Sequence, residues 1–253
     1  MATKINQMLQ ELPPNSVIFS SWMSECGVSR AMQYKYVKSE WLDKLATGVY
    51  MFKGSKPTLF DAMSSYNKQL EKSCFVGAST ALDLRGYSHF VAMGRPLAYI
   101  FTKTDERLPN WLVKHSWDME LRYFTTSIFA NEMFGIEHTA FNGRELLVSS
   151  PERAFLECLH LSPTYFPLMD IYYVMEMLTT LRPKLLQQLL ELCSSVKVKR
   201  LFLYMAEKSG HSWFMALDLD KIDLGSGKRM IEKNGVYNSK YMITLPNELV
   251  DYE

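Results

Sequence analysis

The chain has 253 residues, a net charge of +1 and 47% hydrophobic residues, which is the composition of a globular protein long enough for two or three domains. Its first residues lack the apolar core of a signal peptide, and no apolar run approaches the roughly eighteen residues that a membrane-spanning helix needs. We therefore expect a soluble, cytoplasmic protein without a membrane partner. Residues 1–60 carry 7 basic and 4 acidic side chains, and residues 196–240 carry 9 and 5, so two basic ends flank an acidic middle.

Apolar residues at helical spacing predict a first helix over residues 1–12, which a proline pair ends. Residues 16–53 then have the pattern of a winged helix-turn-helix. Ser20 or Ser21 is expected to cap a short helix, because a serine hydroxyl can accept from the free amides of the first turn.

Gly27 is expected to close that helix, and Ser29 to cap a second helix running to about Ser39. The second helix holds the position of the helix that enters a major groove. Apolar residues from Trp41 to Phe52 predict two short strands on either side of Thr47 and Gly48, which would form the wing.

Two apolar stripes run along the second helix, one with Ala31, Tyr34 and Val37 and one with Met32 and Tyr36, so the pattern leaves its inward face open. The polar residues of this helix and of the wing are candidate contacts to base edges and phosphates. These candidates are Ser29, Arg30, Gln33, Lys35, Lys38, Lys44, Lys53 and Lys56. A small helical subdomain with a solvated basic face and a winged helix that binds a protein are the alternatives. One copy of so mildly basic a segment would bind DNA weakly, which favours a homodimer on DNA.

A linker near Lys56 predicts two domains, residues 1–56 and residues 57–253. Thr58 is expected to cap a helix through Leu70, and Ser79 to cap a short helix that Gly86 ends. Strands are expected over residues 97–102 and 120–126, and over residues 136–141 and 144–149. Asn142 and Gly143 between the last two predict a two-residue hairpin turn.

Ser150, Pro151 and Glu152 predict a helix start, since they combine a hydroxyl cap, a proline at the first position and a carboxylate near the positive end of the dipole. Amphipathic helices are expected over residues 167–181, 183–196 and 197–210, with a final strand over residues 241–245. The chain is therefore expected to be α+β, an N-terminal winged helix-turn-helix followed by a larger mixed α/β domain.

No motif for catalysis, metal or cofactor binding is found. The four cysteines lack paired spacing, and the five histidines are scattered. The segment LGSGKR departs from a phosphate-binding loop at Ile222 and Arg229, so it is expected to be a flexible turn. Asp218, Asp220 and Asp223 have apolar neighbours and are expected to face solvent.

The basic residues Lys199, Arg200, Lys228 and Arg229 are a candidate functional surface. Lys199 and Arg200 lie near the start of a predicted helix, where a cation opposes the dipole, so stability alone gives little reason for them. A solvated basic face is the alternative.

Four segments of the chain are similar to the AbiEi antitoxins of type IV toxin-antitoxin systems, and they cover nearly its whole length. They are VSRAMQYKYVKSEWLDKLATGVY, VGASTALDLRGYSHF, VSSPERAFLECL and KVKRLFLYMAEKSGHSWFMALDLDKIDLGSGKRMIEKNGVYNSKYMITLP. One departure is Glu40, where we expect glycine in this family, so the end of the second helix is expected to differ slightly.

The resemblance implies a winged helix that represses its own bicistronic promoter by binding inverted repeats in double-stranded DNA. It also implies a C-terminal antitoxin domain that neutralises a nucleotidyltransferase-like toxin, without a stable complex between the two proteins. The sequence thus predicts a repressor and antitoxin that is not an enzyme and has no cofactor. The alternatives are a nucleic-acid-processing enzyme that the winged helix targets to DNA, and a C-terminal domain that only binds proteins. Paired carboxylates and a lysine in one pocket would favour the enzyme.

Overall fold

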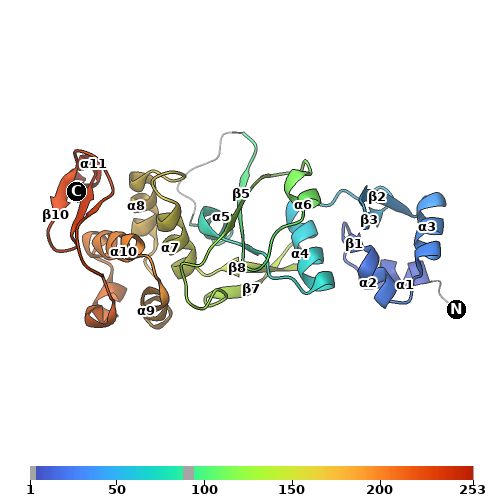
Figure 1. Ribbon diagram of the computed structural model, residues 1–253, viewed down its shortest axis with the longest axis horizontal. Helices are drawn as coiled ribbons and strands as arrows, with labels where there is room; N and C mark the ends of the chain where they lie inside the picture. The colour runs from blue at the N-terminus through green and yellow to red at the C-terminus, as the bar shows by residue number, and fades with distance from the viewer. Residues whose placement is uncertain (1–3, 88–93, 253) are drawn as a thin grey trace.

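A computed structural model of the chain describes residues 4–87 and 94–252. The described elements follow one another along the long axis of the molecule, with the first helices at one end and the last strands at the other (Figure 1). Within these two ranges, no helix has the length and apolarity that crossing a membrane requires.

The N-terminal unit contains α1 (Lys4–Glu11), α2 (Ser20–Glu25) and α3 (Arg30–Lys38) with a three-stranded antiparallel sheet. The sheet has the order β1 (Val17–Phe19), β3 (Val49–Phe52) and β2 (Leu42–Ala46). The two wing strands, β2 and β3, are confirmed. Strand β1 was not predicted, because its three residues are all buried and show no alternation. A small core lies under the helices and consists of Ile5, Met8, Ile18, Met23, Val28, Leu42 and Phe52.

Only one of the two predicted serine caps in this unit is confirmed. The Ser29 hydroxyl accepts from the backbone amide of Met32 and caps α3. The expected cap of α2 is wrong: Phe19 is the N-cap residue, without a side-chain hydrogen bond, and the Ser20 hydroxyl donates to Gln33 instead. Glu40 follows α3 with φ of +58°, a left-handed conformation that glycine adopts without strain.

Helix α4 (Leu59–Leu70) closes the free edge of β1. Val17 donates its backbone amide to the Ser65 hydroxyl at 3.1 Å, and Phe19 donates to Gln69 Oε1 at 3.0 Å. Gln69 Nε2 in turn donates to the Val17 carbonyl at 2.7 Å. An edge strand otherwise leaves such groups unpaired, so α4 completes the small sheet. The predicted boundary near Lys56 stays a prediction.

A mixed five-stranded sheet forms the centre, in the order β6-β5-β4-β8-β7. Its strands are β4 (Phe75–Val76), β5 (Leu97–Thr102), β6 (Glu120–Thr125), β7 (Ile136–Phe141) and β8 (Arg144–Ser149). The hairpin at Asn142 and Gly143 is confirmed, with φ of +47° and +74° at the two turn residues. Strand β4 was missed because it has two residues and pairs with distant partners.

Helix α5 (Ala78–Asp83) starts after Gly77, so the predicted cap at Ser79 is wrong. A Cβ at Gly77 would lie 2.5 Å from atoms of Glu157 and Phe101, which leaves room only for glycine. The buried Glu157 carboxylate accepts from the Ala78 amide at 2.9 Å and from Arg153 Nε at 2.7 Å. The hydrogen bond from Ala78 to Glu157 ties the start of α5 to α7, and Arg153 balances the charge of this carboxylate within α7.

Helices cover the central sheet and lead to the C-terminal end (Figure 1). They are α6 (Asn110–Lys114), α7 (Pro151–Leu161), α8 (Leu168–Met177), α9 (Pro183–Leu192) and α10 (Val196–Ser209). The predicted caps at Thr58 and Ser150 are confirmed, and Gly210 ends α10 with φ of +67°.

The last part of the chain is a small sheet in the order β10-β11-β9, which contains β9 (Arg229–Met230), β10 (Val236–Asn238) and β11 (Ile243–Leu245). Two 3-10 segments, η1 (Ser212–Ala216) and η2 (Leu219–Lys221), precede it, and α11 (Asn247–Asp251) follows it. The predicted final strand over residues 241–245 is confirmed in its last three residues.

Candidate functional site

Helix α3 turns one face inward and leaves the other in solvent, which answers the question that the two apolar stripes left open. Met32, Tyr36 and Val37 pack against the small core, whereas the Tyr34 side chain is 69% exposed. The stripe with Met32 and Tyr36 is therefore the inward one.

Gln33 is not available to DNA, and its assignment as a base contact is corrected. The residue is 2% exposed. Its Nε2 donates to the Ser20 carbonyl at 3.1 Å and to the Val28 carbonyl at 3.0 Å, and its Oε1 accepts from the Ser20 hydroxyl at 2.6 Å. The amide thus joins α2, the turn and α3, because the backbone carbonyls of a buried turn need a donor. Sequence alone shows a polar residue on a helix, not the carbonyls that it will meet.

The outward face of α3 carries Arg30, Lys35 and Lys38, all exposed, beside Ala31 and Tyr34. Arg30, Tyr34 and Lys38 are spaced four residues apart and so lie along one stripe of the helix. Tyr34 was not among the predicted contacts, because its apolar ring suggested a place in the core.

The lysines of the wing differ in whether a carboxylate lies beside them. Lys44 on β2 and Lys56 after β3 are exposed. The Lys53 ammonium lies 3.4 Å from the Asp43 carboxylate and 4.0 Å from that of Glu40. Part of its charge is therefore balanced within the protein, which weakens its attraction for a phosphate.

The predicted basic surface at the C-terminal end is wrong for two of its four residues. Arg200 is fully buried and Lys199 is 4% exposed. The Arg200 guanidinium donates Nε to the Leu224 carbonyl at 2.9 Å, Nη2 to Gly225 at 3.1 Å, and Nη1 to Gly227 at 2.7 Å and to Met242 at 3.1 Å. The segment from Leu224 to Gly227 thus wraps its carbonyl oxygens around a buried cation.

This arrangement also gives the LGSGKR segment a structural role. Its carbonyls point to Arg200, and Gly225 and Gly227 have φ of +59° and +76°, which side chains rarely adopt. Lys228 and Arg229 remain exposed, and the Lys228 ammonium lies 4.8 Å from the centroid of the Tyr237 ring.

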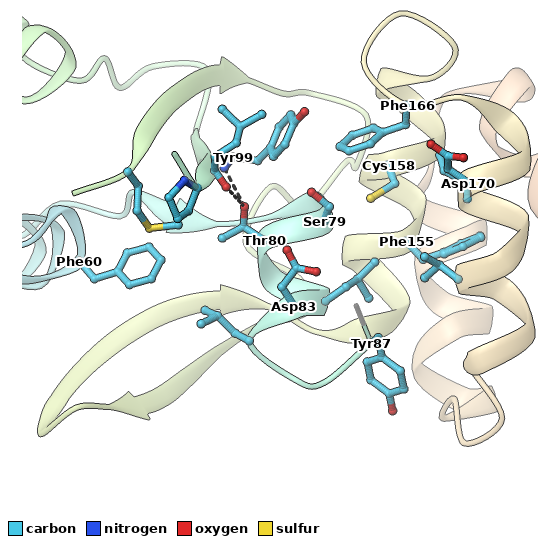
Figure 2. Close-up of a pocket in the computed structure, with 17 residues that line it drawn as sticks. Phe60, Ser79, Thr80, Asp83, Tyr87, Tyr99, Phe155, Cys158, Phe166 and Asp170 are labelled. Atoms are coloured by element: carbon cyan, nitrogen blue, oxygen red, sulfur yellow. Dashed lines mark hydrogen bonds between the residues drawn. The ribbon is translucent and has the colours of Figure 1, made fainter. Parts of the chain in front are cut away.

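A cavity of about 490 Å³ lies between α5, β5 and helices α7 and α8 (Figure 2). The labelled aromatic side chains around it are Phe60, Tyr87, Tyr99, Phe155 and Phe166, and the carboxylates of Asp83 and Asp170 lie in its wall.

The polar groups of this cavity are largely engaged or inactive. The Thr80 hydroxyl accepts from the Tyr99 amide at 3.0 Å and donates to the Leu97 carbonyl at 3.3 Å. Burial raises the pKa of the Cys158 thiol well above its ordinary value, so the thiolate needed of a nucleophile is disfavoured. The described residues that line the cavity supply carboxylates but no lysine, so they do not assemble the set that would favour the enzyme alternative.

Metal ligands are not grouped in the part of the chain that the structure describes: there, no three histidine, cysteine or acidic side chains come together to hold an ion. Asp218 instead pairs with Lys221 at 2.7 Å, and Asp223 accepts from the Gly225 amide at 2.7 Å.

A winged helix-turn-helix with an exposed basic helix, joined to a mixed α/β part, is an architecture found among DNA-binding regulators. Two family models match the chain. One, described as the N-terminal domain of the AbiEi antitoxin transcriptional regulator, matches residues 1–93. The other, described as the transcriptional regulator AbiEi antitoxin of type IV toxin-antitoxin systems, matches residues 95–246. The chain belongs to this AbiEi antitoxin family, which confirms the resemblance seen in the sequence.

The crystal structure of the RV2827C protein from Mycobacterium tuberculosis is similar in fold. The similarity covers 94% of this chain and 88% of that one, with a TM-score of 0.61 and 15% sequence identity. At this identity the likeness concerns the fold alone. Comparison with curated proteins gives no match.

Proposed function

We propose that the chain represses its own toxin-antitoxin operon by binding inverted repeats in the promoter, and that its C-terminal part counteracts a nucleotidyltransferase-like toxin without forming a stable complex with it. The family supports an antitoxin and transcriptional regulator. The observation that carries the DNA-binding half is the exposed face of α3, where three cations and one aromatic ring have no structural partner in the core.

The roles of the side chains follow from their places on α3 and the wing. Arg30 is proposed to contact base edges, since residues in the first turn of such a helix reach furthest into the groove. Lys35 lies in the last turn of α3 and is proposed to contact a phosphate. Lys38, Lys44 and Lys56 are proposed to contact phosphates. Ser29 stays at the interface as the cap that fixes the start of the helix, and Lys53 contributes less because it is paired.

Two copies on one operator are part of the proposal. With five cations free on the helix and wing, one copy would make few phosphate contacts, and its binding would be weak at physiological salt. Residues 1–56 are proposed as the DNA-binding unit and residues 57–253 as the antitoxin part. Because α4 completes β1, we expect a fragment that includes α4 to be the more stable form of the unit.

A fluorescence anisotropy titration of the full chain tests this function. The native promoter duplex should bind more tightly than a scrambled duplex of equal length, and Arg30→Ala should reduce that difference. Lys184→Ala is the matched control, because Lys184 is an exposed cation on α9, distant from α3 (Figure 1). Equal affinity for native and scrambled duplexes would reject sequence-specific binding.

Co-expression with the protein encoded by the adjacent reading frame tests the second half. Growth rescue by the full chain is the expected result. Rescue that persists when Arg30, Lys35 and Lys38 are all alanine would separate neutralisation from repression. Failure of the wild-type chain to rescue would reject the proposed antitoxin role for that toxin.

A further inference from the structure

The outer face of the C-terminal sheet bears exposed apolar side chains in one row. Met230 on β9 and Tyr237 on β10 both pair with Thr244 on the central strand β11. Directly opposite residues on neighbouring strands point to the same face of a sheet. The Met230 side chain is 70% exposed and that of Tyr237 is 41% exposed, whereas Ile243 and Leu245 on the opposite face are fully buried.

One cation without a carboxylate partner, Lys228, lies beside this row. Lys228 lies two residues before Met230, and its ammonium lies over the Tyr237 ring. Among the described ion pairs, Lys221 has Asp218 and Lys240 has Glu207, but no carboxylate is paired with Lys228 or Arg229. Lys228 is therefore an exposed charge that borders the row and is available to an anion, whereas Arg229 is opposite Ile243 and so lies on the other face of the sheet.

The fold holds this face in a fixed shape. Arg200 binds the carbonyls of the segment that leads into Lys228, and it also binds the Met242 carbonyl next to β11. A Cβ at Gly235 would lie 2.0 Å from the Leu245 carbonyl oxygen, so β10 approaches β11 as closely as only glycine permits. A backbone held in one shape loses little freedom on binding, which favours affinity.

We propose that this face, defined by Lys228, Met230 and Tyr237, binds single-stranded nucleic acid. A base would stack on Tyr237 with Met230 beside it, and Lys228 would contact a flanking phosphate. Proteins that bind single strands without sequence preference use exposed aromatic rings next to cations. Every base has a π-face that can stack on a ring, and every nucleotide has a phosphate that a cation can contact. The activity goes beyond promoter binding by α3, which lies at the other end of the molecule (Figure 1).

A second exposed tyrosine offers a matched comparison. Tyr165 is 39% exposed and has the Arg122 guanidinium 5.4 Å from its ring centroid. Arg122, however, lies 4.0 Å from the Glu120 carboxylate. This tyrosine therefore has the same ring and a similar cation, but a balanced charge, so it is not expected to bind a polyanion.

The test is anisotropy of a labelled oligouridylate of about ten nucleotides, a length within the usual range for one such surface. The full chain is used with Arg30, Lys35 and Lys38 changed to alanine, so that α3 does not contribute. In this background Tyr237→Ala should weaken binding roughly 5- to 150-fold, and Tyr237→Phe should restore most of it. Lys228→Ala should lower the slope of log affinity against log salt by about 0.7.

Several outcomes would overturn the proposal. These are no binding of the oligouridylate, equal losses for Tyr237→Ala and Tyr165→Ala, or an unchanged salt slope in Lys228→Ala. Loss of toxin neutralisation by Tyr237→Ala with unchanged oligouridylate binding would also overturn it, and would assign the face to a protein partner. Promoter binding is measured in parallel with Tyr237 variants in which α3 is intact. Unchanged promoter binding would show that any loss of oligouridylate binding is independent of the repressor function.

Discussion

Arg200→Met should destabilise the C-terminal end of the protein, because it removes a charged donor that four backbone carbonyls share. A hydrogen bond from a charged group contributes about 1.5 to 3 kcal/mol, so four such bonds set an upper value near 12 kcal/mol. Three of the acceptor carbonyls belong to a partly exposed segment, at Leu224, Gly225 and Gly227. These carbonyls can accept hydrogen bonds from water when the guanidinium is removed. Removing a buried cation also removes its desolvation penalty. We therefore expect a loss of roughly 3 kcal/mol.

Thermal unfolding followed by circular dichroism measures this loss. For a chain of this size 1 kcal/mol corresponds to a shift of about 2 to 4 °C in Tm, so Arg200→Met should melt roughly 6 to 12 °C lower. Arg200→Lys should recover little, because an ammonium is a point donor that cannot span four carbonyls. Arg107→Met is the matched control, since Arg107 is exposed, and surface changes of this kind usually alter stability by about 0.5 kcal/mol or less. A Tm for Arg200→Met equal to that of the control would refute the argument that the guanidinium holds this segment.

The remaining predictions concern the winged helix and the response to pH. Gln33→Ala should lower stability by roughly 1 to 3 kcal/mol, since it leaves buried carbonyls without a donor, and it should weaken binding to every duplex alike. Arg30→Ala should relax base preference at defined positions by roughly 1 to 3 kcal/mol. Lys44→Ala should flatten the salt dependence of binding more than Lys53→Ala, because Lys53 is already paired. Burial is the main cause that lowers the pKa of the His160 imidazole, and the charge of Lys197 adds to it. The unfolded chain therefore binds a proton at His160 more readily than the folded chain, and stability should fall as the pH drops below about 6.5.

Each of these predictions has a result that would contradict it. A changed sequence preference in Gln33→Ala at normal stability would return the residue to the DNA interface. Equal salt slopes for the two wing variants would show that Asp43 and Glu40 do not balance Lys53. His160→Gln should remove part of the loss at low pH, and an unchanged loss in this variant would contradict the assignment to His160.

Local signals in the sequence were sufficient where the structure depends on neighbouring residues. The hairpin at Asn142 and Gly143, the helix start at Ser150 and the caps at Ser29 and Thr58 are all set within four residues of chain. Strands β1 and β4 depend instead on partners 24 or more positions away, and they are too short to show a period. Sequence reasoning therefore found the hairpins and helices but not the strands that join them into sheets.

The candidate sites followed the same rule. Arg30, Lys35 and Lys38 could be named from their places on one helix, but the burial of Gln33 depends on the path of the preceding turn. Arg200 illustrates the same limit over a longer distance. Its neighbours Leu201 and Phe202 indicate a buried face. The carbonyls that accept hydrogen bonds from its guanidinium belong to residues more than twenty positions later in the chain. The signal in the sequence was the pair of glycines in that segment, Gly225 and Gly227, which permit the positive φ angles that the segment adopts around Arg200.

A basic residue thus tells little about function until its acceptors are known. Lys197 donates its ammonium to the carbonyls of His160 and Ser162 at the end of α7, where the helix dipole favours a cation. Together with Arg200 it accounts for two of the cations that made the C-terminal end look basic in sequence. Backbone carbonyls satisfy these two, so they offer nothing to a phosphate. Among the described residues, Lys228 lies against an aromatic ring and pairs with no carboxylate. This residue, rather than the net charge of its segment, is the evidence for a polyanionic partner.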